Sequence, residues 1–390
     1  MELDINSALL SAQFFLSSRV GINETGFDTN CKLEKTPIEI FDINKKILFY
    51  DFYIKSNNGI VASIRCAANK GVGDPIVSYT HNPFDPNVDK LLISKNFSSN
   101  NTTVIKSCYT CYAYPKVGVE IEWQESIKTT TLRSLFDPYS LELLDKDISS
   151  WENQTPINEA DGYFYISYFD WIPEGGEQEL YEQRINVIKR ITERATKTQL
   201  SAKQRTALEK TSYKISDYDF DNLSDYFIKN KPAQRIISMP VQLIGQETKD
   251  YCALASAQML LSYYNKQFTQ QQLIVPMGYH TGGTSQKDQV NGYKQLLGDK
   301  FKIIYDREPA WEKSVAEINS NRPFKSGIFC HARVCAGYQI LIYLDPETRS
   351  PIREEHYLLI HDPLPENHGH IYWELFDKQT YYNTITINLS

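Results

Sequence analysis

The chain has 390 residues and a formal net charge of −7, with acidic and basic residues interspersed. This length exceeds the size at which one hydrophobic core usually keeps growing, so we expect about two domains. The charge balance offers no basic surface for nucleic acid or an anionic membrane. No apolar run approaches the roughly 18 residues that span a bilayer, so we expect no membrane span and no nucleic-acid partner.

A strand-rich region follows a predicted helix over residues 3–18. Residues 47–54 and 59–66 are β-type runs on either side of the turn Ser56-Asn-Asn-Gly59, which is typical of a hairpin. Further β-type runs extend this hairpin into a small antiparallel sheet; they are residues 74–79, 104–114 and 117–123. Tyr is the commonest aromatic residue, which suits half-buried strands. The pattern predicts an N-terminal α+β domain.

The middle of the chain changes in composition. Residues 178–210 have a helical pattern, with charged residues around a sparse apolar set. Residues 211–231 are polar and rich in Asp, Ser and Tyr, so we place a linker there, before Pro232. We therefore expect a first domain over residues 1–230, including this helical linker region, and a second domain over residues 232–390.

The second domain contains a cysteine at the start of a predicted helix. Residues 253–264 are strong helix formers without Gly or Pro, which places Cys252 at or just inside the helix N-terminus. The positive end of a helix dipole lowers a thiol pKa and favours a nucleophilic thiolate. Gln246 stands six residues earlier, where its amide and the Cys252 backbone N–H are suited to donate to an oxyanion. A buried structural cysteine would explain the alanines of this helix but not the polar run over residues 246–250.

A thiolate nucleophile requires a base, and six histidines follow Cys252. They are His280, His331, His356, His361, His368 and His370. We favour His331, which opens a predicted strand over residues 331–343. The next predicted strand ends at Asp362, and a carboxylate leaving a neighbouring strand can orient an imidazole through its second nitrogen. The resulting chain order is cysteine, histidine, acid.

A glycine loop precedes another predicted helix, over residues 286–297. Gly282, Gly283 and Thr284 in this loop are suited to offer backbone groups to an extended substrate. An ordinary glycine turn with a helix N-cap at Thr284 or Ser285 explains the same residues equally well.

The cysteines and late histidines give no clear metal site. Cys108 and Cys111 have redox or zinc spacing, but no second pair accompanies them, so buried thiols or a local disulfide explain them better. His368 and His370 lack a carboxylate or cysteine at ligand spacing. We therefore expect no metal and no cofactor.

Taken together, these residues resemble the papain-like cysteine peptidases. The shared features are Gln246, the helix that starts at Cys252, the His-x-x-Val-x-x-Gly-Tyr strand that starts at His331, and Asp362 followed by Pro363. Within that clan the chain looks most like the bacterial double-glycine, or bacteriocin-processing, peptidase branch, over about residues 239–390. The resemblance implies a papain-like domain, in which a helical half carries the cysteine helix and an antiparallel β half carries the histidine and the aspartate.

The resemblance also implies a role for each residue. Cys252 would be the nucleophile, His331 the general base and acid, Asp362 the orienting acid and Gln246 an oxyanion-hole donor. Ala253 is a departure, because many relatives carry Gly or Trp after the nucleophile, and this leaves the shape of the adjoining pocket open.

We expect a thiol peptidase that hydrolyses a peptide or protein substrate. The same triad would also serve an amidase, a deamidase or an acyltransferase, and a non-catalytic papain-fold binding protein is a third alternative. The strands of residues 1–230 faintly resemble pro-domain-like or cystatin-like sheets of secreted bacterial cysteine peptidases, which would make the protein a zymogen; a fixed binding module is the alternative. No secretory signal is visible at the acidic start of the chain, and a secreted or cell-surface location is favoured over the cytoplasm.

Overall fold

The computed structural model describes residues 3–99, 101–113, 116–126, 130–149, 176–199, 221–328, 331–376 and 381–389. The fold is mixed α+β, as expected. The strands of the described residues form one sheet in the order β11-β16-β12-β13-β14-β15-β5-β4-β3-β2-β6-β7-β8-β9, with β1 beside β3 and β10 beside β13. No helix within these ranges is long and apolar enough to cross a membrane.

The N-terminal half supplies one side of this sheet. Its helices are α1 (Ile5–Gly21), η1 (Lys70–Val72) and α2 (Val88–Asn96). Its strands are β1 (Lys32–Leu33), β2 (Ile38–Asp42), β3 (Ile47–Ser56), β4 (Gly59–Ala67), β5 (Ile76–Thr80), β6 (Thr102–Ala113), β7 (Lys116–Glu125), β8 (Thr131–Phe136) and β9 (Leu143–Asp145). The predicted first helix, hairpin and three later strands are thus confirmed as α1, β3 with β4, and β5, β6 and β7.

Two helices connect the halves along the chain, α4 (Gly176–Gln199) and α6 (Asp221–Lys229). The helix predicted over residues 178–210 is confirmed as α4 up to Gln199, and residues 200–220 lie outside the described residues. Instead of a plain polar linker, residues 221–229 form a helix because Leu223, Tyr226 and Phe227 share an apolar face that packs on α1.

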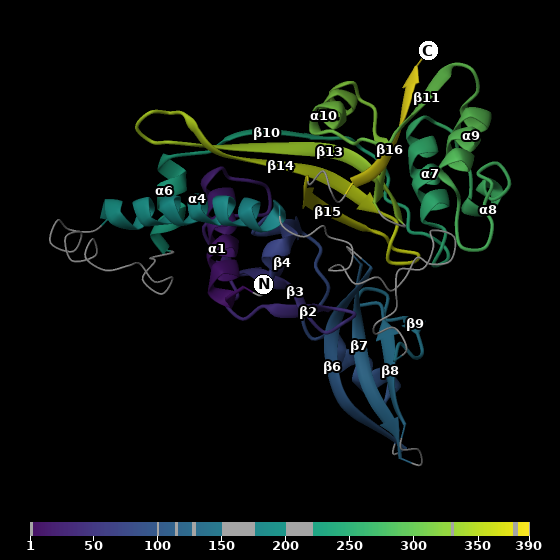
Figure 1. Cartoon of the computed structure of the whole chain (residues 1–390), viewed down its shortest axis with the longest axis horizontal. Helices are drawn as coiled ribbons and strands as arrows, with labels where there is room; N and C mark the ends of the chain where they lie inside the picture. Colours follow the sequence, from purple (N-terminus) through teal and green to yellow (C-terminus); the bar gives the residue numbers. More distant parts are fainter. Residues whose placement is uncertain are drawn as a thin grey trace.

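The C-terminal half pairs a group of helices with a set of antiparallel strands. Its helices are α7 (Cys252–Tyr263), α8 (Gln270–Leu273), α9 (Gln286–Leu297) and α10 (Trp311–Asn319). Its strands are β10 (Ala233–Ser238), β11 (Phe301–Asp306), β12 (Phe324–Ile328), β13 (His331–Leu344), β14 (Pro351–Asp362), β15 (His370–Leu375) and β16 (Tyr381–Leu389). Figure 1 shows α7, α8 and α9 gathered at one end of the long strands β13 and β14, and β6, β7 and β8 extending away from them as an arm.

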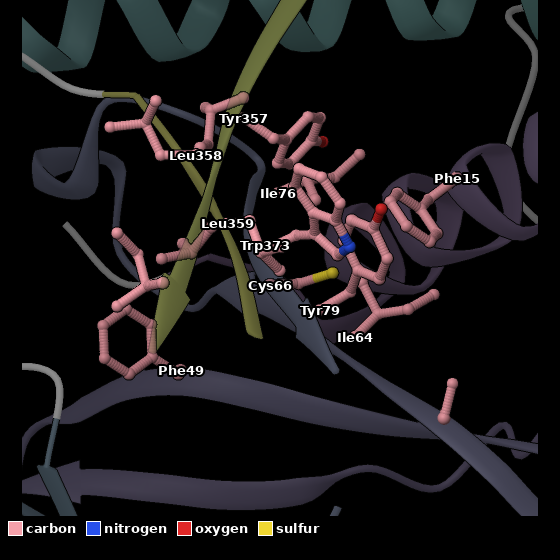
Figure 2. Close-up of a cluster of buried hydrophobic side chains, with 14 of the residues drawn as sticks. Phe15, Phe49, Ile64, Cys66, Ile76, Tyr79, Tyr357, Leu358, Leu359 and Trp373 are labelled. Atoms are coloured by element: carbon pink, nitrogen blue, oxygen red, sulfur yellow. The ribbon is translucent and has the colours of Figure 1, made fainter. Parts of the chain in front are cut away.

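One hydrophobic core joins the two halves. Strand β15 pairs with β5, so that Trp373 lies opposite Tyr79, and their rings stack with centroids 6.3 Å apart. Phe15 of α1 packs on the same tyrosine at 4.8 Å, and Tyr357 of β14 meets it edge-on at 5.7 Å. Figure 2 shows these rings converging from both halves. The division at residues 230–232 stays a prediction, and the two sides of it share buried surface.

A buried arginine network reinforces this contact. Arg19 of α1 is fully buried and pairs with Glu24 at 3.3 Å and with Glu355 of β14 at 3.6 Å. The guanidinium also lies over the rings of Phe15 and Tyr357, at 4.4 and 5.1 Å from their centroids. Because removing one partner leaves a buried charge uncompensated, such a network depends on both halves being in place.

Candidate active site

Cys252 is the first residue of α7. Residues 252–263 contain Ala, Leu, Met and Gln at most positions, which favour a helix, and no side chain caps its N-terminus. The backbone N–H groups of the first turn therefore remain available beside the thiol. Cys252 packs against Ala253 and against Ala332 of β13. The predicted position of the cysteine at a helix N-terminus is confirmed.

His331 and Asp362 come together because β13 and β14 are antiparallel neighbours. His331 begins β13 and Asp362 ends β14, so both lie at the same end of the pair. His331 Nε2 and Asp362 Oδ1 are 2.7 Å apart and hydrogen-bonded in the buried interior. Asp362 also accepts hydrogen bonds from the backbone N–H of Leu364 at 2.9 Å and from the Tyr372 hydroxyl at 3.1 Å.

These contacts hold Asp362 as a carboxylate. Burial would raise its pKa, but the charge and hydrogen bond of His331, together with the charge of Arg333, lower the pKa of Asp362 to about 2. A negative charge is therefore fixed against one nitrogen of the imidazole. The other nitrogen, Nδ1, is buried and has no hydrogen-bond partner of ordinary geometry among the described residues.

The His331 imidazole lowers the pKa of the Cys252 thiol. Burial alone would raise its pKa, yet the pKa of Cys252 lies below the ordinary value because of the side chain and charge of His331, the charge of Lys116 and a backbone hydrogen bond from Ala332. Cys66, Cys111 and Cys335 are buried as well, and burial raises the pKa of each. Cys252 is thus the buried thiol whose surroundings favour the thiolate.

Gln246 lies on the segment that leads into α7. Its backbone N–H donates to the Pro363 carbonyl and its carbonyl accepts from the Asn367 N–H, both at 2.8 Å. The loop that follows Asp362 therefore holds Gln246 in place. A Cβ at Gly245 would collide with the backbone of this loop, so only glycine allows the close approach. The side-chain amide donates to the Thr248 carbonyl at 2.7 Å.

The glycine loop reaches the same region through Asp250. Asp250 Oδ2 accepts hydrogen bonds from the Tyr279 hydroxyl at 2.6 Å and from the Gly282 N–H at 3.3 Å. Because Asp250 stands two residues before Cys252, the loop lies beside the start of α7. Ser285 is the N-cap of α9, its side chain accepting from the Asp288 N–H, which confirms one of the two expected capping positions.

Three of the other histidines, His356, His361 and His370, lie in packed surroundings. His356 stacks on Trp311 with ring centroids 4.3 Å apart. Burial lowers the pKa of both His361 and His370 to about 4. The Tyr139 hydroxyl lies 3.2 Å from His370 Nε2. His370 is the first residue of β15, which pairs with β14 as the second strand of a hairpin.

Cys108 and Cys111 are free thiols, so the expected alternative of a disulfide between them is wrong. Burial raises the pKa of both. Within the described ranges, no group of three or more His, Cys, Asp or Glu residues could hold a metal ion.

Some neighbours of the site were not predicted from the sequence. Lys116 belongs to β7, far away in the chain, and no local pattern connects it with Cys252. Asp250 lies within the polar run over residues 246–250, and this run was the sequence feature that could have indicated its place near the site. Lys325 is the single charged residue in the short strand region Phe324 to Ile328, and this too was a signal.

Comparisons with known proteins concern the C-terminal half. Residues 238–386 match the sequence model of the Peptidase_C39 like family. Two peptidases are among the solved structures that align with the chain. One is the peptidase domain of Streptococcus ComA, a bifunctional ABC transporter involved in quorum sensing, with 14% identity, 38% of this chain and 99% of that chain covered, and a TM-score of 0.27.

The other is a double glycine motif protease from an AMS/PCAT transporter in complex with the leader peptide, with 18% identity, 41% and 98% of the two chains covered, and a TM-score of 0.29. No curated protein sequence matches the chain. The family match confirms the predicted resemblance of the C-terminal half to double-glycine peptidases.

Proposed function

We propose that the protein is a cysteine peptidase in which Cys252, His331 and Asp362 form the catalytic triad. The observation that carries this proposal is the 2.7 Å hydrogen bond between Asp362 and His331, beside a buried thiol whose pKa is lowered. Asp362 fixes the imidazole through Nε2 and leaves Nδ1 for the proton of Cys252. The match of residues 238–386 to a peptidase family supports the same reaction class.

The reaction follows from these positions. His331 removes the thiol proton, and the thiolate attacks the carbonyl carbon of the scissile amide, forming a C–S bond and an oxyanion. The intermediate collapses with cleavage of the C–N bond, and the imidazolium returns its proton to the leaving amine. Water then hydrolyses the thioester, with His331 acting as the base, which restores the thiol.

The oxyanion requires hydrogen-bond donors. The backbone N–H of Cys252, in the first turn of α7, is one candidate, and the Gln246 amide is the second. Gln246 Nε2 uses one hydrogen on the Thr248 carbonyl and retains another. Its complete burial and its attachment to the loop after Asp362 support a fixed position.

We further propose that the N-terminal half keeps the site covered. Cys252 is 4% exposed, His331 5% and Gln246 0%. Lys116 lies near enough to influence the Cys252 thiol, and it lines a cavity of about 100 Å³ together with Asp362 and Tyr139. An extended substrate cannot reach a site this closed, so turnover requires displacement of the arm formed by β6, β7 and β8.

The test uses the complete chain. On incubation, the wild type is expected to accumulate cleavage between residues 211 and 238 with time, and the Cys252→Ala variant is not. Cys31→Ala, at a partly exposed cysteine, is the matched control and should behave like the wild type. The same variants are then mixed with a peptide library before and after limited proteolysis by an added protease.

The outcomes separate the two parts of the proposal. Cleavage of neither the chain nor the library by the wild type, or equal cleavage by Cys252→Ala, overturns the peptidase. Library cleavage at the same rate before and after limited proteolysis overturns the covered site but not the triad.

A further inference from the structure

Lys325 is a lysine buried in the interior of the C-terminal half. It lies in the middle of β12 and is 1% exposed. Its Nζ donates to Gln286 Oε1 at 3.1 Å and to Asn383 Oδ1 at 2.5 Å. Gly327 makes room for this arrangement, because a Cβ there would lie 2.6 Å from Lys325 Nζ and 2.5 Å from Asn383 Oδ1.

The partners of Lys325 are neutral amides, and this is unlike the buried arginines. Each of three buried arginines has a carboxylate partner: Arg19 with Glu24, Arg333 with Glu374, and Arg353 with Glu355. No described carboxylate lies within ion-pair distance of Lys325. A buried ammonium without a carboxylate is costly, so burial lowers the pKa of Lys325 to about 7, and a carboxylate brought by a substrate would stabilise its charged form.

The sheet register places Lys325 on the face that carries the nucleophile. Lys325 and Gly327 pair with Val334 and Ala332 of β13, so these four residues share one face. Ala332 packs directly on Cys252, and α7 covers both β12 and β13. Burial lowers the pKa of Lys325 to about 7, and the charge of the Cys252 thiolate opposes that shift, which is consistent with their closeness.

Further hydrogen-bond donors around Lys325 have no partner. Asn383 pairs with Gly327 across β16 and β12, and its Nδ2 is buried without a hydrogen bond in the described structure. Thr284 Oγ1 is likewise buried and unsatisfied, and it stands two residues before Gln286, the α9 residue that Lys325 contacts. Buried donors without acceptors are unusual in folded proteins. Together with the third N–H of the ammonium, they form a donor-rich group that matches a carboxylate.

We propose that Lys325, Asn383 and Thr284 form a subsite beside Cys252 that binds an acidic side chain of the substrate. This inference rests on the proposed peptidase function and makes it more specific. Thr284 belongs to the glycine loop that the sequence predicted as a substrate contact, so the loop supplies a side chain to the subsite. Lys325 is then the residue that selects Glu or Asp over a neutral side chain at one substrate position.

The experiment measures recognition through covalent capture. Peptidyl vinyl sulfones carry Glu or Gln at the first, second or third residue before the reactive group, with Ala or Gly elsewhere. The Cys252 thiolate adds to the alkene carbon β to the sulfone, so that a C–S bond forms as the C=C π bond breaks, and the carbon next to the sulfone takes a proton from His331. The rate constant of modification at Cys252 is read by intact and peptide mass spectrometry on the full chain, before and after limited proteolysis by an added protease.

For the wild type we expect Glu to react roughly tenfold faster than Gln, or more, at one of the three positions, because a hydrogen-bonded charge pair discriminates by at least this factor. Lys325→Met should reduce the Glu-to-Gln ratio to about one. Asn383→Asp keeps the volume of the side chain and gives Lys325 a permanent carboxylate, so it should also remove the preference. Lys287→Met, at an exposed lysine next to Gln286, is the control and should retain it.

The contrary results are distinguishable. Modification of Cys252 by all probes with a Glu-to-Gln ratio near one overturns the subsite and leaves the peptidase intact. Equal slowing of the Glu and Gln probes by Lys325→Met would mean that Lys325 acts by stabilising the Cys252 thiolate. This result also overturns the subsite. No modification of Cys252 by any probe, either before or after limited proteolysis, overturns the peptidase and the subsite together. If Lys325→Met does not fold, the Glu-to-Gln ratio of the Asn383→Asp variant tests the subsite, and a ratio equal to that of the wild type overturns it.

Discussion

Replacing Asp362 with Asn tests the electrostatic part of the triad without removing its shape. The side chain keeps its size and can still accept from His331 Nε2, as Oδ1 does now at 2.7 Å. It loses the negative charge that faces the imidazole. In the proposed mechanism the Cys252 thiolate and a protonated His331 form a pair of opposite charges, and the Asp362→Asn variant lacks the carboxylate that would stabilise the positive member of this pair.

The size of the effect follows from the state of Asp362 itself. Its pKa lies at about 2 instead of 3.8, in spite of burial, chiefly through the charge and hydrogen bond of His331. That difference corresponds to roughly 2.5 kcal/mol. Since the interaction is mutual, Asp362→Asn should reduce the population of the thiolate–imidazolium pair by up to roughly 70-fold. Arg333 and Leu364 contribute to the same shift, so this figure is an upper bound.

The assay is the rate of Cys252 alkylation by iodoacetamide between pH 5 and 9, followed by mass spectrometry. For the wild type, the rate should already be high near neutral pH. For Asp362→Asn, it should be lower at neutral pH and approach the wild-type rate as the pH rises, because the thiol then ionises without the imidazolium. Superimposable pH profiles for the two proteins would refute the reasoning.

Three further outcomes are expected. Gln246→Ala should lower turnover of a cleaved library peptide by about 100-fold or more without changing the rate of Cys252 alkylation, since an oxyanion donor acts only in the transition state. Equal turnover by Gln246→Ala and by the surface control Gln267→Ala contradicts this role. Arg19→Met should lower the free energy of unfolding in urea by about 3–5 kcal/mol, because Glu24 loses its ion-pair partner and the buried Glu355 keeps only Arg353. A loss below about 1 kcal/mol would show that this network does not join the halves. Asp362 has a lowered pKa, so its contribution is complete above about pH 4 and is lost as the pH falls through about 2; acid unfolding of Asp362→Asn should therefore lack this component, and identical acid transitions argue against it.

The sequence predicted elements whose signals are local. The helix start at Cys252 follows from its composition, and the hairpin of β3 and β4 follows from a turn between two β-type runs. The meeting of His331 and Asp362 was predictable because consecutive antiparallel strands bring one strand start next to the following strand end. These features depend on residues close together in the chain.

The missed features depend on contacts between distant segments. Lys116 approaches Cys252 only because β5 pairs with β15 and brings the N-terminal strands to the same sheet. The position of Lys116 near Cys252 therefore had no local signal in the sequence. The sequence predicts a polar linker over residues 221–229 because only three buried apolar residues form one face of this helix. The surface of α1 packs on that face and stabilises the helix.

Alkylation in competition among the cysteines tests the central claim most directly. Cys31 and Cys108 are more exposed than Cys252, but burial raises the pKa of each, whereas the surroundings of Cys252 lower its pKa. With limiting iodoacetamide at pH 6.5, we predict that Cys252 is modified first in the wild type and that His331→Ala abolishes this preference. Earlier modification of Cys31 or Cys108 in the wild type, or an unchanged preference in His331→Ala, would contradict a Cys252 thiolate maintained by His331.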